Sequence, residues 1–248
     1  MAERTMTMKR GALPSPRHEL AAATPHVPLP TVPSTHLIFP KKLSIWHNDT
    51  HGDCVTAEEA FAKACHDPEV FISDAEVQKW ATSHGWYDGA NLIDVLKAMQ
   101  KKGFLQDKTE YNDGAVNSVN WTDEATLRSA IFHGPVKIGV AADQLQAACQ
   151  AHDFKSGWIA TGFKPDKNED HCVSLCGYGT IDWLAQQMGV TLPKGVDGTQ
   201  PGYAMFTWGS IGIIDAPSLL AITQEAWLRT PTTIEIGNLH PKSSAARH

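Results

Sequence analysis

Apolar residues recur at helical spacing in the first half of the chain and alternate with polar residues in much of the second half. The helical spacing predicts helices over residues 54–65, 73–84, 91–102 and 122–132. Ser73 is a favourable N-cap for the second of these, and Gly103 ends the third. The first half of the chain is therefore expected to be helical.

Strand-like alternation begins at about residue 135. It predicts short strands over residues 135–140, 157–161, 171–178 and 203–208, and helical spacing returns at 182–188 and 218–228. Residues 143–152 and 166–170 have the composition of a solvated rim. Because the helices precede the strands without βαβ alternation, the order of elements predicts an α+β fold and not a doubly wound sheet.

The chain of 248 residues with 42% apolar content is long enough for one sizeable core. Residues 1 to about 36 contain six prolines and no periodic apolar pattern, so we expect an extended or disordered arm. The folded domain is expected over 37–237, and a polar tail over 238–248.

Charge and hydropathy exclude several kinds of partner. The net charge is −6 and the 21 basic residues form no stripe, so nucleic acid is not an expected partner. No segment approaches the ~20 apolar residues that span a bilayer, so no membrane partner is expected. The first thirty residues lack the apolar run of a secretory signal, which favours a soluble, cytoplasmic protein. No signal for an oligomeric state is present.

The five cysteines form an odd set without a CxxC pair, which indicates reduced thiols. Cys172 and Cys176 are an even number of residues apart, so both lie on one face of their strand and are expected to be packing residues. A zinc site can be drawn from His51, Cys54, His171 and Cys172, but their spacing is unlike that of structural zinc sites. We expect neither a metal nor a cofactor.

Two residues stand in positions suited to nucleophilic catalysis. A thiol becomes a good nucleophile as thiolate, which the positive end of a helix favours, and Cys54 lies at a predicted helix start. His171 opens an apolar strand, where a rigid element could hold it as the base. Taken singly, each residue is equally compatible with a role in packing.

The segments around these residues resemble a known family. His51-Gly-Asp-Cys54 before a helix, and Asp170-His171-Cys-Val-Ser-Leu-Cys-Gly-Tyr-Gly179, are similar to the two active-site segments of papain-like cysteine peptidases. Gly134-Pro135-Val136 and Trp208-Gly209 extend the resemblance, which covers roughly residues 37–212. It implies a helical half followed by an antiparallel sheet or barrel half, with the active-site cleft between them.

The resemblance also implies further site residues. Asn48 stands six positions before Cys54, where the family has its oxyanion-binding glutamine, and its amide could donate the same hydrogen bond. The family's histidine-orienting asparagine aligns with Phe206, which cannot hydrogen-bond to an imidazole. Thr207 can take that role only if a bulge re-aims the strand. After Gly212 the chain is expected to turn helical where the family continues as sheet.

These observations predict a cysteine hydrolase of peptidase or amidase type. Cys54 and His171 would act as a dyad through an acyl-enzyme, on a peptide or another amide or ester. An acyltransferase using the same dyad is one alternative. A catalytically altered or inactive papain-fold binding or structural protein is the other, and the missing asparagine motivates it.

Overall fold

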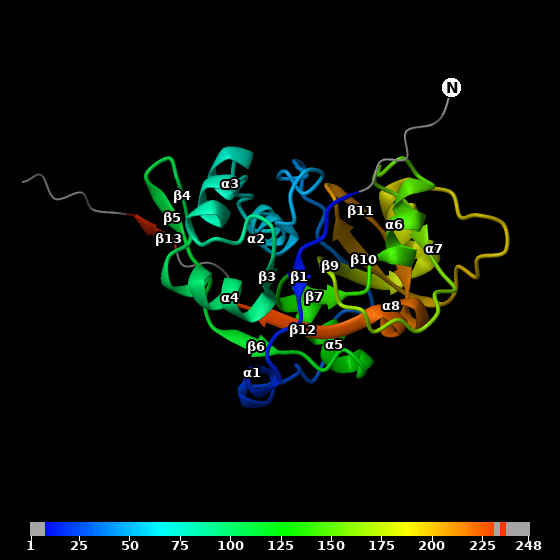
Figure 1. Cartoon of the computed structure of the whole chain (residues 1–248). Helices are drawn as coiled ribbons and strands as arrows, with labels where there is room; N and C mark the ends of the chain where they lie inside the picture. The colour runs from blue at the N-terminus through cyan, green and yellow to red at the C-terminus, as the bar shows by residue number, and fades with distance from the viewer. Residues whose placement is uncertain (1–7, 231–233, 237–248) are drawn as a thin grey trace, which may run out of the picture.

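A central sheet of eight strands forms the middle of the computed structural model, which describes residues 8–230 and 234–236 (Figure 1). Seven strands follow the order β6-β12-β7-β9-β10-β11-β8, and β2 pairs with β9 beside them. Every pairing is antiparallel except that of β11 with β8. The strands are β2 (His36–Leu37), β6 (Val116–Ser118), β7 (Val136–Val140), β8 (Ile159–Ala160), β9 (His171–Thr180), β10 (Pro201–Thr207), β11 (Ser210–Asp215) and β12 (Thr223–Arg229).

Helices flank this sheet, and the α+β fold predicted from the sequence is confirmed. The helices are α1 (Arg17–Ala22), α2 (Cys54–Ala64), α3 (Asp74–Ser83), α4 (Leu92–Lys101), α5 (Glu124–His133), α6 (Asp143–Gln150), α7 (Ile181–Met188) and α8 (Ala216–Ile222). Two small sheets complete the structure, one of β1 (Ala12–Leu13) with β3 (Ala90–Asn91), the other of β4 (Phe104–Gln106), β5 (Thr109–Tyr111) and β13 (Ile234–Ile236). Helices α3 and α4 lie with the β4–β5 hairpin at one end of the molecule, and α6, α7 and α8 lie at the other (Figure 1).

Local chemistry explains why the helices begin where they do. Ser73 caps α3 by accepting a hydrogen bond from the backbone N–H of Glu76, as its position in the sequence predicts. Asn91 caps α4 in the same way through the N–H of Asp94. The predicted and observed bounds of these helices consequently agree within one or two residues.

Two apolar clusters lie on opposite sides of the central sheet. Cys172 and Cys176 belong to the cluster that includes the α2–α4 side, whereas Val173 and Leu175 of the same strand belong to the other cluster. The prediction that the two cysteines share a packing face is confirmed, because successive residues of a strand point to opposite faces.

The C-terminal part of the domain differs from its predicted structure. The expected helix over 218–228 is wrong, since α8 ends at Ile222 and β12 begins at Thr223. Strand β12 lies between β6 and β7, with both faces covered, so Trp227 enters one cluster and Leu228 the other. Burial on both faces removes the alternation that marks a strand. The expected helical departure after Gly212 is therefore also wrong, because the chain there continues mainly as sheet.

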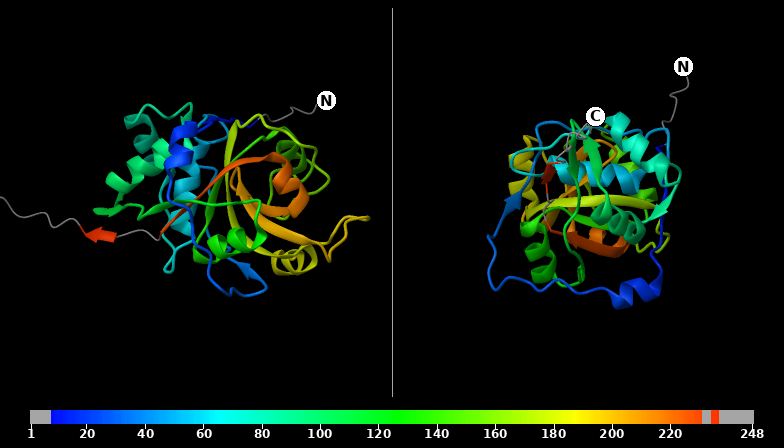
Figure 2. Two further views of the ribbon diagram at one scale, coloured as in Figure 1. Left: turned by 90° about the horizontal axis from the view of Figure 1, so that it is seen from below. Right: turned by 90° about the vertical axis from the view of Figure 1, so that its left-hand side faces the viewer.

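Residues 8–36 run along the outside of the domain and across its front. Figure 2 shows this segment, in blue, descending one side to α1 and returning along the lower edge to β2. Arg128 of α5 holds the returning part by donating to the carbonyl oxygens of Pro33 and Ser34.

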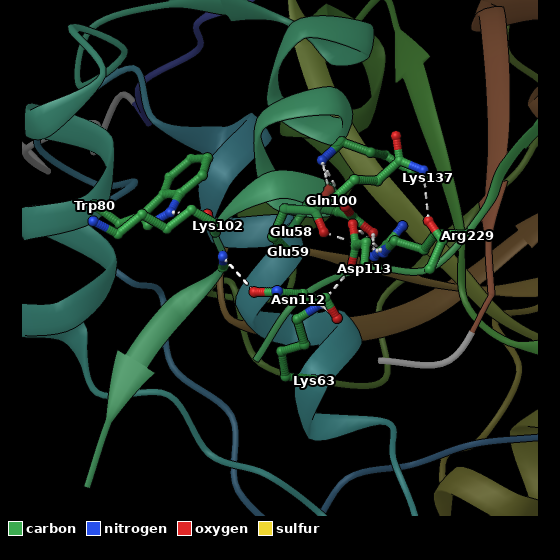
Figure 3. A network of polar contacts seen from close by, with 12 residues as sticks. Glu58, Glu59, Lys63, Trp80, Gln100, Lys102, Asn112, Asp113, Lys137 and Arg229 are labelled. Carbon is green, nitrogen blue, oxygen red and sulfur yellow. Dashed lines mark hydrogen bonds and ion pairs between the residues drawn. The ribbon is translucent and has the colours of Figure 1, made fainter. Parts of the chain in front are cut away.

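A buried network of charged side chains joins α2 to the sheet (Figure 3). Glu58 and Glu59 project from α2, Lys137 from β7 and Arg229 from β12. The Lys137 ammonium pairs with both glutamates and also donates to the carbonyl oxygen of Val55, 2.8 Å away. Arg229 Nη2 donates to Glu58 Oε1 at 2.8 Å, and its Nε lies 3.2 Å from Glu59 Oε2.

A second pair continues this network toward the end of α2. Lys63 pairs with Asp113, and both side chains are buried. Burial alone would raise the pKa of Glu59, but Arg229, Lys137 and Lys63 lower it to about 2. Glu59 therefore stays ionised inside the protein. Because Glu59 lies beyond the first turn of α2, its role is to hold the helix against the sheet through these ion pairs.

Replacing Lys137 by methionine tests this account of the network. Lys137→Met leaves Glu59 buried with less compensating charge, so the free energy of unfolding in urea should fall by about 3–5 kcal/mol. The control Lys79→Met removes an exposed lysine paired with Glu76 on α3 and should change it by less than about 1 kcal/mol. A Lys137→Met protein as stable as the control would contradict the role given to the network.

Candidate active site

Cys54 is the first residue of α2 and is almost completely buried. Its thiol lies against the backbone of Cys172, which follows His171 in β9, and against that of Gly11 from the N-terminal segment. Burial raises the pKa of the Cys54 thiol to about 12, although the backbone N–H groups of Cys172 and Gly11 act in the opposite direction. The thiol is therefore protonated at neutral pH in this arrangement.

His171 opens β9 and is held by two neighbours. Its Nε2 lies 2.8 Å from the hydroxyl oxygen of Thr207, and the Trp208 indole stacks on its ring with centroids 4.2 Å apart. Its Nδ1 is buried and has no hydrogen-bond partner among the residues that the structure describes. Burial, with a smaller contribution from the charge of Arg10, lowers the pKa of His171 to about 3. The imidazole is neutral, and its one unpartnered nitrogen is free to act on a proton.

The contact between Thr207 and His171 depends on an irregularity in β9, where Cys176 is an extra residue between the partners of Ala204 and Met205. The pairing of β10 with β9 shifts register between Ala204 and Met205, which is the kind of bulge that the sequence required for Thr207 to reach the histidine. Phe206 points to the opposite face and stacks on Phe61 of α2, with centroids 4.0 Å apart. The structure thus brings Thr207 to His171 and directs Phe206 into the core.

Asn48 is buried in the loop before α2, and its amide is already engaged. The Asn48 Nδ2 atom donates to the carbonyl oxygen of His51 at 3.0 Å. The same amide lowers the pKa of Asp53, but burial is the larger effect and raises that pKa to about 8. An oxyanion at Cys54 would therefore have to use the second amide hydrogen of Asn48, because the first is bonded to the His51 carbonyl oxygen.

Residues 8–13, which we call the strap, cross the site in an extended conformation. The Trp208 indole N–H donates to the carbonyl oxygen of Lys9 at 3.1 Å, so the strap is fixed on the sheet side. On the helical side the backbone N–H of Ala90 donates to the carbonyl oxygen of Gly11 at 2.9 Å, and β1 pairs with β3. Between these contacts the strap covers Cys54.

The strap approaches the loop before Cys54 so closely that only glycine fits at position 11. A Cβ on Gly11 would collide with the backbone carbonyl of Gly52, which has no flexible side chain that could move away. The carbonyl oxygens of Lys9 and Gly11 are bonded to Trp208 and Ala90. Neither carbonyl is bonded to the Asn48 amide, so the strap covers Cys54 without a carbonyl held by that side chain.

No group of three or more histidine, cysteine or acidic residues in the described part of the chain could hold a metal ion. The zinc arrangement drawn from His51, Cys54, His171 and Cys172 therefore does not form. Among the described residues, no helix is long and apolar enough to cross a bilayer.

The fold has close counterparts among solved structures. The cysteine protease xylellain from Xylella fastidiosa superposes with a TM-score of 0.60 at 14% identity, over 93% of this chain and 99% of that one. The proform of the ragweed pollen cysteine protease Amb a 11 gives 0.59 at 12% identity, over 87% and 72%. Bromelain from Ananas comosus, with the inhibitor E64, gives 0.54 at 11% identity, over 81% and 100%. This chain has the papain-like fold.

The likeness is one of structure, because no protein-family model and no curated protein matches the chain by sequence. In this papain-like fold, Cys54 and His171 come from the helical half and the sheet half respectively, as the resemblance of the two sequence segments implied.

Sequence reasoning missed the strap within this papain-like fold. The sequence predicts an extended or disordered arm over residues 1–36 but does not identify Met8 to Leu13 as the part that crosses the site, because a contact between residues more than forty positions apart leaves no local periodicity. The solvated rim predicted over 143–152 was likewise not connected to the site, although α6 within it contacts the strap through Asp143 and Gln146. An available signal was Gly11 directly after two basic residues, in a segment otherwise rich in proline.

A substitution at Gly11 should uncover the thiol. Gly11→Ala forces the strap away from Gly52, so alkylation of Cys54 by iodoacetamide, measured by peptide mass mapping, should accelerate about ten-fold or more, which corresponds to about 1.4 kcal/mol. Gly134→Ala is the matched control, because a Cβ at that position meets nothing within 4 Å. Equal alkylation rates in the two variants would show that the strap does not restrict access.

The carboxyl of Asp53 should make stability depend on pH. Its pKa is about 8 in the folded chain and about 3.9 when unfolded, so between these values the unfolded chain is ionised while the folded one stays protonated. Stability from this group falls as pH rises from 4 to 8. The gain in melting temperature of Asp53→Asn over the wild type should therefore be larger at pH 8 than at pH 5. Asp153→Asn, which changes an exposed aspartate paired with a lysine, is the matched control.

Proposed function

We propose that the protein is a cysteine hydrolase of peptidase or amidase type, in which Cys54 is the nucleophile and His171 the base. The observation that carries the proposal is the placement of the two residues. Cys54 begins a helix that packs on β9, and its thiol touches the backbone of Cys172, the residue next to His171. The free Nδ1 of His171 and its Nε2 contact with Thr207 fit an imidazole oriented to take a proton.

The chemistry follows the ordinary course for a thiol nucleophile. Cys54 gives its proton to His171 and its sulfur bonds to the substrate carbonyl carbon. The bond to the leaving group breaks as His171 returns the proton to the departing nitrogen or oxygen. Water, deprotonated by His171, then cleaves the thioester. Thr207 would orient the imidazole, and Trp208 would keep water from one face of its ring.

The oxyanion would be bound at the start of α2. The first N–H groups of a helix lack intrahelical partners, so the Cys54 backbone N–H can donate to a developing negative charge. Asn48 would supply a second donor by giving up its interaction with Asp53. The protonated form of Asp53 suits this arrangement, since an ionised carboxylate there would repel the oxyanion.

In the proposal, the structure represents a resting state. The strap excludes substrate from Cys54, and burial holds both the thiol and the imidazole in their neutral forms. Turnover requires the strap to leave, which would readmit water and a substrate carbonyl. An inactive papain-fold binding protein is the second candidate, favoured by the burial of Cys54 and by Phe206 in place of a hydrogen-bonding residue.

An active-site label separates the two candidates. The bromelain structure contains the inhibitor E64, and an epoxide of this kind should label the present chain at Cys54, slowly in the wild type and faster in Gly11→Ala. Labelling should disappear in Gly11→Ala/Cys54→Ala and fall at least about 100-fold in Gly11→Ala/His171→Ala, the usual contribution of a general base. Labelling that is equally fast without His171 would favour the binding protein.

A further inference from the structure

The side chain of Arg10 in the strap makes more specific contacts than the strap backbone does. Arg10 Nη1 lies 2.5 Å from Asp143 Oδ1 and 2.7 Å from Asp170 Oδ2, and its Nη2 donates to Gln146 Oε1 at 2.9 Å. Asp143 and Gln146 lie on α6, and Asp170 directly precedes His171. Three acceptors from two separate parts of the chain therefore surround one guanidinium, directly beside the dyad.

One of the acceptors, Asp170, is fixed by contacts that do not involve Arg10. The second carboxylate oxygen of Asp170 accepts the backbone N–H of Ala142 at 3.0 Å, which leaves Oδ2 turned toward the guanidinium. The Asp170 N–H donates to the carbonyl oxygen of Val140 at 3.1 Å, and its own carbonyl accepts the N–H of Ala12 at 3.1 Å. The same residue thus binds an extended backbone and the side chain that this backbone carries.

An isolated surface ion pair would contribute little, but this arrangement differs from one. The Arg10 side chain is 22% exposed and that of Asp170 26% exposed, so the contact is shielded, and it involves both terminal nitrogens of a planar group. Such charge-assisted contacts on a guanidinium are directional as well as stronger than neutral ones.

The position of Arg10 relative to Cys54 indicates what the site is for. Gly11, the next residue, lies against the Cys54 thiol. Arg10 therefore occupies the position that a bound peptide would fill with the side chain next to its residue at Cys54. A substrate that displaces the strap must leave these three acceptors exposed or supply a cation to them. The Asp170 carboxylate, left partly covered beside His171, and the Asp143 carboxylate, which is 74% exposed, would favour a substrate with its own cation.

We propose that Asp143, Asp170 and Gln146 form a subsite for an arginine side chain of an extended peptide, and that Arg10 fills it while the strap is in place. This proposal rests on the proposed hydrolase function for its biological meaning. It names the substrate class of that site as peptides with arginine next to the residue at Cys54.

A binding measurement tests the subsite without requiring turnover. The full chain with Arg10→Ala, Gly11→Ala and Cys54→Ala has its strap displaced from Gly52, presents an empty subsite and cannot form an acyl-enzyme. The probe is a fluorescein-labelled peptide Met-Lys-Arg-Gly-Ala-Leu, compared with the same peptide in which uncharged citrulline replaces arginine. Fluorescence polarisation should show about ten-fold tighter binding of the arginine peptide, because citrulline keeps the shape and loses the charge. Equal affinities would overturn the proposal.

Added substitutions locate the effect. With Asp143→Asn the preference for arginine should fall to about three-fold or less, since one of the two carboxylates is lost. Asp153→Asn is the matched control, because this exposed aspartate shortly after α6 pairs only with Lys155 and should leave the preference unchanged. An arginine preference that survives both Asp143→Asn and Asp170→Asn would place the arginine elsewhere and overturn the proposal.

The hydrolase function and the subsite can fail separately. The Arg10→Ala/Gly11→Ala chain with Cys54 intact is incubated with both unlabelled peptides, and cleavage is followed by mass spectrometry. Cleavage of both peptides at equal rates would overturn the subsite and support the hydrolase. A ten-fold binding preference without any cleavage would uphold the subsite and count against the hydrolase.

Discussion

The buried ion pairs between α2 and the sheet are the constraint on which the arrangement of the site depends. Lys137 and Arg229 come from adjacent strands, and both reach the glutamates Glu58 and Glu59, one turn along the helix from Cys54. Buried charges tolerate little displacement, because each must keep its partners. The helix start is thereby fixed against β9, and the thiol is fixed with it.

The same rigidity explains how an incomplete set of family residues can still form a site. Phe206 fills the core against Phe61 where a polar residue would face the histidine, and the bulge at Cys176 in β9 shifts the register so that the neighbouring Thr207 hydroxyl reaches His171 instead. A one-residue shift in the pairing of β9 with β10 thus places a hydroxyl at His171, although position 206 carries a phenylalanine. Asn48 is a similar case, since its shorter side chain is held by the His51 carbonyl close to the start of α2.

Much of the fold could be predicted because its signals are local. Caps such as Ser73 and the alternation along β9 depend on neighbours in sequence, and the two active-site segments are short. The strand β12 was mistaken for helix because burial on both faces erased its alternation. The contacts of the strap and of Arg10 could not be predicted because they join residues about 40 to 199 positions apart, and no periodicity records which surface an extended segment will meet.

Because the strap is covalently attached to the domain, it determines the concentration of free peptide that is needed to displace it from Cys54. A segment tethered beside its own binding site competes as though it were present at an effective concentration in the millimolar range. A free peptide of equal intrinsic affinity would therefore half-fill the cleft only at about millimolar concentration. Peptides that bind better, or that are held nearby by another part of the protein, would gain access first. The strap would thereby set the affinity that a peptide must exceed to reach Cys54. Modest differences in peptide affinity would then become differences in access to the thiol.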